Sequence, residues 1–184
     1  MYSNSIARRT FVKKSLIGFG GLVMLQRCSF EPNYLEFLSK EEARLLDAIA
    51  EQFIPTDQDP GAKEACVVNF IDTQLTKNYK RFQQNYRQGL EAFKKTCKDV
   101  KGKIFESLRS DEQIAFLELI ESGDVPETYW DFQKPATFLR LMLSHCMQGF
   151  YGDPRHGGNC NHVSYKMINL QVIQFYHPET TAAS

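Results

Sequence analysis

Apolar side chains recur along most of this chain at intervals of three or four residues, the period of an α-helix with one buried face. On this basis helices are predicted over residues 40–53, 62–76, 78–100, 110–121 and 135–149. No convincing pair of segments alternates apolar and polar residues as half-buried strands do. The pattern predicts an all-α fold, a compact bundle of about five helices followed by a Gly-rich C-terminal loop.

Three helix starts carry recognisable local signals. Ser39 with Glu42, and Ser110 with Gln113, have the spacing of a capping box, in which the first side chain and the fourth satisfy free backbone N–H groups. Pro135 suits the first position of a helix, where its missing N–H costs nothing.

The amino terminus has the form of an export signal. Arg8 and Arg9 are followed by Phe11 and Lys13, and then by a mildly apolar run over residues 15–25. The run is too short to span a bilayer, which takes about 20 residues. The arrangement resembles a twin-arginine signal, whose route carries folded cargo into the periplasm. A disordered basic arm, or an amphipathic helix on a membrane, is the alternative interpretation.

Cys28 stands where a lipoprotein signal would place its lipidated cysteine, although Arg27 replaces the small residue expected before it. A lipid there would hold the mature chain on a membrane surface without spanning it. Both the lipidated and the unlipidated form stay open. We therefore divide the chain into a signal segment (1–28), a linker (29–38) and a helical domain (39–184).

Charge is distributed unevenly. Five of the 22 basic residues lie in residues 1–27, which contain no acid, so 17 basic residues face 22 acidic ones in the rest of the chain. A mildly acidic body excludes the basic surface that nucleic-acid-binding proteins need.

The cysteines beyond Cys28 are Cys66, Cys97, Cys146 and Cys160, which allow three disulfide pairings. A chain that folds before export does so where thiols stay reduced. We therefore predict that no disulfide is required for folding.

Potential metal ligands gather near the C-terminal end of the chain: His145, Cys146, Asp153, His156, Cys160 and His162. Their spacing matches no familiar zinc or haem motif. An independent metal- or thiol-dependent enzyme built on residues 145–162 is the enzymatic alternative, with Cys160 and His162 as a nucleophile pair.

The Gly-rich loop is the preferred candidate for a partner-binding surface, because ordered loops with Arg and aromatic residues often carry binding. Its predicted contact residues are Tyr151, Asp153, Arg155, His156, Gly157, Gly158 and Asn159. We expect Gly157 and Gly158 to adopt backbone angles that a side chain would strain. In a purely structural interpretation, Asp153 and Arg155 pair or cap within the loop.

The run Gly149-Phe-Tyr-Gly-Asp-Pro-Arg-His-Gly-Gly-Asn159 resembles the signature of the gluconate 2-dehydrogenase subunit 3 family. Residues 46–57, the Pro-Gly-Ala run at 60–62 and residues 165–168 are similar to further segments of that family. The resemblance covers roughly residues 40–170.

The resemblance implies a small, non-catalytic subunit of a periplasmic complex that oxidises sugars or sugar acids. It implies that FAD lies in a large partner subunit of the glucose-methanol-choline type, and that a cytochrome c subunit with haem c often accepts the electrons. It implies no cofactor or metal in this chain, which would assist folding and twin-arginine export of the flavin subunit. A stand-alone lipoprotein that binds envelope components is a further alternative.

Overall fold

Helices make up most of residues 35–170, the part of the chain that this computed structural model describes. The α-helices are α1 (Lys40–Phe53), α2 (Val67–Thr76), α3 (Gln83–Lys101), α4 (Ser110–Ser122), α5 (Pro135–Tyr151) and α6 (Val163–Met167). Short 3-10 turns lie between them: η1 (Lys80–Phe82), η2 (Phe105–Ser107), η3 (Glu127–Tyr129), η4 (Pro154–His156) and η5 (Cys160–His162). No strand occurs within residues 35–170, so the all-α prediction is confirmed.

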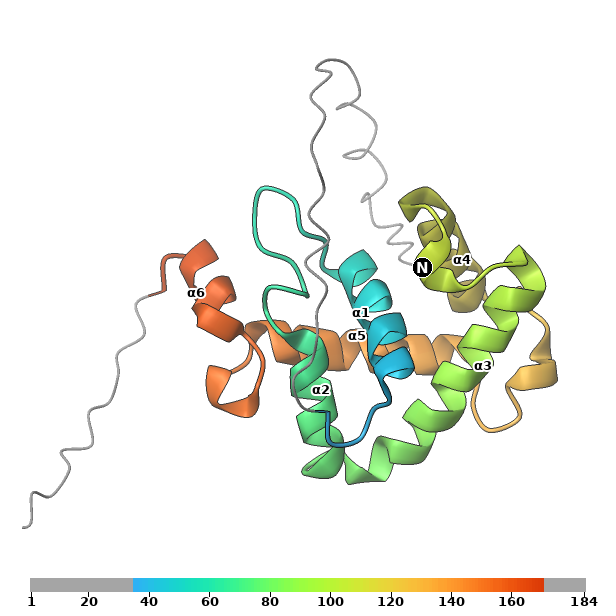
Figure 1. Cartoon of the computed structure of the whole chain (residues 1–184), viewed down its shortest axis with the longest axis horizontal. Helices are drawn as coiled ribbons and strands as arrows, with labels where there is room; N and C mark the ends of the chain where they lie inside the picture. Colours follow the sequence, from blue (N-terminus) through green and yellow to red (C-terminus); the bar gives the residue numbers. More distant parts are fainter. Residues whose placement is uncertain (1–34, 171–184) are drawn as a thin grey trace, which may run out of the picture.

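Helix α5 is the centre of the bundle. It runs across the middle of Figure 1 behind α1 and α2, and it contacts each of the other five α-helices. Its inward face contributes Phe138, Met142, Cys146 and Phe150 to the core, all fully buried. Burial of such side chains from several helices around one centre is the main stabilising contribution to a fold of this type.

Two of the predicted helix starts are confirmed. Ser39 caps α1: its hydroxyl accepts from the N–H of Glu42 at 3.2 Å, and the Glu42 carboxylate accepts from the N–H of Ser39 at 2.8 Å. Pro135 is the first residue of α5.

The predicted capping box of the fourth helix is wrong. Helix α4 begins with Ser110, and Arg109 is the residue before it, so the carboxylate that reaches back belongs to Glu112. Gln113 is buried instead, where its side chain donates to the carbonyl of Phe105 and accepts from Gln52.

Helix α2 begins five residues later than predicted, at Val67. Residues 62–66 form turns after Pro60-Gly61, and Cys66 has a left-handed backbone with φ of 55°. An apolar pattern does not distinguish a turn packed against the core from the first turn of a helix.

A buried carboxylate ties the beginning of the described chain to α2. Asp72 is 1% exposed and accepts backbone N–H bonds from Glu36 (2.7 Å), Phe37 (3.0 Å) and Leu38 (2.7 Å). Leu38 is itself buried. The last residues of the predicted linker are therefore part of the folded domain, whereas the signal segment and Cys28 lie outside the described residues.

We expect Asp72→Asn to lower the free energy of unfolding by about 2 kcal/mol, because its amide NH₂ would face a backbone N–H and leave that donor unpaired. Urea denaturation of the two proteins measures this. Thr76→Val is the control, since it removes the hydroxyl bonds to the Glu36 carboxylate and the Thr73 carbonyl and leaves the Asp72 bonds to the backbone intact. Equal stability of Asp72→Asn and the unmodified chain would contradict the anchoring role.

Candidate partner-binding surface

The Gly-rich loop after α5 is fixed between α2 and α5. On the α2 side, the Asn69 amide donates to the carbonyl of Gly157 at 2.7 Å, and Gln74 donates to the carbonyl of His156 at 3.4 Å. On the α5 side, the N–H of Asn159 donates to the carbonyl of Gly149 at 2.8 Å. The loop is therefore an ordered part of the fold.

Asn159 organises the interior of this loop and is fully buried. Its amide donates to the carbonyl of Gly152 at 3.0 Å, and its side-chain oxygen accepts from the N–H of Ser164 at 3.0 Å. Gly152 also accepts from the Tyr165 hydroxyl at 3.1 Å. Asn159 thus has a structural role and offers no surface to a partner.

The two adjacent glycines are needed for different reasons. Gly157 has a φ of 94°, as predicted. Gly158 does not have a positive φ, so the prediction of strained backbone angles is wrong there. A Cβ on Gly158 would instead lie 2.2 Å from the carbonyl oxygen of Gly149, so the requirement is for close contact between two backbones.

Asp153 and Arg155 bond to each other. One Asp153 oxygen accepts from the N–H of Arg155 at 3.0 Å, and the other accepts from its guanidinium at 3.0 and 2.8 Å. The hydrogen bonds from Arg155 lower the pKa of Asp153. The pair caps η4, as the structural interpretation expected, and both side chains remain open to solvent.

A disulfide joins Cys66 to Cys160 across 94 residues, with the two Cα atoms 5.6 Å apart. It connects the N-terminal end of α2 to the Gly-rich loop. Cys97 and Cys146 are free and buried, as small core residues. That the chain folds without the disulfide stays a prediction. The nucleophile pair proposed from the sequence, Cys160 with His162, has no free thiol, because the sulfur of Cys160 is bonded to Cys66.

The six potential metal ligands do not converge. No group of three His, Cys, Asp or Glu side chains within residues 35–170 is placed to hold a metal ion. Cys146 lies fully buried in the core, where burial raises its thiol pKa, and Cys160 is in the disulfide.

His145 is stacked between two tyrosines. Its ring lies 4.1 Å from that of Tyr79 and 5.8 Å from that of Tyr86, nearly parallel to both. Its Nδ1 and the Tyr86 hydroxyl are hydrogen-bonded at 3.0 Å. Burial, with the charge of Arg81, lowers the pKa of His145 to about 4. The ring is therefore neutral at pH 7 and packs as part of the core.

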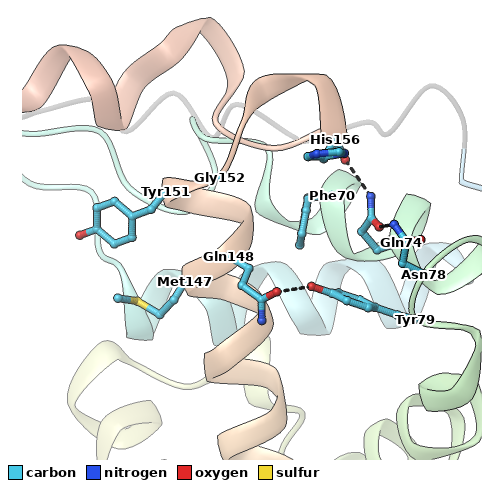
Figure 2. Close-up of a pocket in the computed structure, with 9 residues that line it drawn as sticks. All are labelled: Phe70, Gln74, Asn78, Tyr79, Met147, Gln148, Tyr151, Gly152 and His156. Carbon is cyan, nitrogen blue, oxygen red and sulfur yellow. Dashed lines mark hydrogen bonds between the residues drawn. The ribbon is translucent and has the colours of Figure 1, made fainter. Parts of the chain in front are cut away.

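A groove opens beside this stack, between α2, α5 and η4. Its volume is about 530 Å³, and we call it the α2–α5 groove. Figure 2 shows Tyr79 and Gln148 meeting through a hydrogen bond on one side and His156 above Gln74 on the other. The lining residues are Phe70, Gln74, Asn78, Tyr79, Met147, Gln148, Tyr151, Gly152 and His156.

Of the loop side chains predicted to bind a partner, Tyr151 and His156 line this groove. The rest of the lining was not among the predicted contact residues, and it includes Met147, which is 41% exposed. Leu143, Met147 and Tyr151 are all exposed and follow one another at intervals of four residues. They form a solvent-facing apolar stripe on α5, next to the groove.

The chain matches the family model described as Gluconate 2-dehydrogenase subunit 3 over residues 40–171. The chain belongs to the gluconate 2-dehydrogenase subunit 3 family. Neither curated proteins nor solved structures gave a match. As a member of the gluconate 2-dehydrogenase subunit 3 family, the chain is a small subunit of a dehydrogenase complex, and a larger catalytic partner is implied. Within residues 35–170, no helix is long and apolar enough to cross a membrane.

Proposed function

We propose that this chain is the non-catalytic small subunit of a periplasmic, FAD-dependent dehydrogenase complex that oxidises a sugar or sugar acid. It assists folding and stability of a glucose-methanol-choline type flavin subunit and carries that subunit through the twin-arginine route. A cytochrome c subunit that receives the electrons belongs to the same proposal. The family match over residues 40–171 is the observation that carries it.

The side chains of the 145–162 segment support an accessory role. His145 and Cys146 belong to the core, Cys160 forms a disulfide, and Asp153 bonds to Arg155. Four of the six residues on which an independent enzyme would have relied therefore have other structural tasks. What remains exposed around them is a groove and an apolar stripe, which are features of a binding surface.

Replacing Arg8 and Arg9 together by Lys should leave both this chain and its flavin partner in the cytoplasm, because the twin-arginine route reads the arginine pair. Cell fractionation with a dehydrogenase assay measures it. Lys14→Arg is the control, since it keeps the positive charge of the segment and leaves the arginine pair, Phe11 and Lys13 intact. Normal periplasmic activity in the double variant would refute the escort role.

The same fractions also answer the question of the lipid at Cys28. Intact mass spectrometry of the exported chain distinguishes a lipid-bearing cysteine from a chain processed without one. Either result is compatible with the escort role, which depends on the arginine pair.

A further inference from the structure

We infer that the α2–α5 groove, together with the apolar stripe on α5, is the docking site for an amphipathic segment of the catalytic subunit that carries acidic residues beside an apolar anchor. This inference rests on the proposed function, which supplies the partner. It moves the binding site from the tip of the Gly-rich loop to the helices beside it.

The apolar part of the surface is continuous. Met147 and Tyr151 belong both to the groove and to the stripe, and Figure 2 shows them side by side on the same face of α5. Leu143 extends this face by one turn. Three large apolar side chains exposed at successive turns of the central helix form a track that suits an amphipathic segment lying along it.

The α2–α5 groove lies beside the stripe and suits an apolar anchor side chain of the partner segment. Phe70, 6% exposed, contributes an apolar surface to the groove, and Tyr79 forms part of its wall. Gln74 and Gln148 present amide groups that are already held by neighbours, Gln74 by Asn78 and Gln148 by Tyr79. A preformed pocket with rigid walls spares part of the ordering cost of binding.

Charge identifies the kind of segment that fits. The two stretches that form this face, residues 73–90 and 132–152, contain no Asp or Glu, although the body as a whole is acidic. Lys77, Lys80 and Arg81 are exposed in and before η1, next to the groove residues Asn78 and Tyr79.

Arg140 is exposed on α5, two turns before Met147 and on the same face. We call Lys77, Lys80, Arg81 and Arg140 together the basic rim of the groove. Lys77, Lys80, Arg81 and Arg140 make no ion pair within residues 35–170, in contrast to Arg87, which pairs with Glu42. Unpaired cations around an apolar groove favour a partner with carboxylates at the rim and select against a basic one.

The test uses the full-length chain co-expressed with the flavin subunit. Lys77→Glu with Lys80→Glu reverses the rim, and Met147→Ala with Tyr151→Ala removes the apolar contact. Each double variant should weaken the complex at least about tenfold, the cost expected for a central contact. The affinity of the unmodified complex should also fall with salt, and that of the rim variant should fall less.

Matched controls lie at the far end of α3. Lys103→Glu reverses an exposed charge that makes no ion pair with any residue the structure describes, and Ile104→Ala removes an apolar side chain that is 52% exposed. Both sites lie beyond the C-terminal end of a 19-residue helix, whose N-terminal end adjoins η1 and Arg81. That length is about 28 Å. Both controls should bind the flavin subunit normally.

The outcomes separate the two proposals. If the unmodified chain binds no flavin subunit, the proposed function fails. If it does bind, and the groove variants retain full affinity while circular dichroism shows them folded, the groove is not the docking site. If the apolar double variant melts early, the rim variant decides alone, because both of its side chains are exposed and make no ion pair within the described residues. An unchanged salt dependence in the rim variant would exclude an acidic partner segment.

Discussion

Replacing Cys66 and Cys160 by Ser should lower the melting temperature of the purified chain by on the order of 15 °C. The disulfide closes a loop of 94 residues, and in the chain-entropy description a cross-link of that length destabilises the unfolded state by about 5 kcal/mol. A domain of this size has a stability of roughly 0.05–0.15 kcal/mol per residue, so the variant should remain folded at 25 °C. Thermal melting followed by circular dichroism measures both statements.

The reductant provides the internal control. It should reproduce the low melting temperature in the unmodified chain and leave the double Ser variant unchanged, because Cys97 and Cys146 are buried and unpaired. Folding of the reduced chain would agree with the sequence-based prediction that no disulfide is needed for folding. A melting temperature that reductant does not alter would show that the bridge contributes nothing to stability.

Most of the fold could be predicted from periodicity because the core follows it. In α1 the buried residues include Leu45 and Leu46, and Ile49 follows them after four and three residues, as expected for one face of a helix. The start of α1 was predictable as well, because its capping box consists of neighbouring residues and needs no tertiary contact.

Other boundaries could not be predicted because tertiary contacts decide them. Cys66 has a left-handed backbone where its bridge to Cys160 meets the start of α2. Gln113 is buried between Phe105 and Gln52, although its spacing from Ser110 suggested a cap. In each case a partner distant in sequence overrides the local preference.

The Gly-rich loop predicted from the sequence adjoins the proposed docking groove, but of its predicted contact residues Tyr151 and His156 line that groove. The Gly-rich motif suggested Asp153, Arg155 and Asn159 as partner contacts, but the hydrogen bonds of these residues stabilise the loop. The exposed face of α5 was harder to find, because Leu143 and Met147 lie in a helix that is apolar on most sides. One signal was available: residues 73–90 and 132–152 lack acidic residues, and these two segments fold against each other.

The close contact between the loop and α5 should make Gly158 the least replaceable residue of the Gly-rich motif. A Cβ there would lie 2.2 Å from the carbonyl oxygen of Gly149 and 3.0 Å from its Cα. Gly149 cannot move away from the loop, because it belongs to the central helix and Phe70 packs where a side chain of residue 149 would lie. We therefore expect Gly158→Ala to lower the free energy of unfolding by about 4 kcal/mol or more, in the range reserved for severe steric conflict.

Gly102→Ala is the matched comparison for this substitution. Gly102 has a φ of 68°, but nothing lies within 4 Å of the position of its Cβ, so the added methyl meets only a backbone penalty of about 1 kcal/mol. Urea denaturation of both variants separates the two causes. If Gly158→Ala cost no more than Gly102→Ala, the loop would be free to move away from α5. Asn159 would then not need its bond to the Gly149 carbonyl, and the loop could not serve as a rigid wall of the α2–α5 groove.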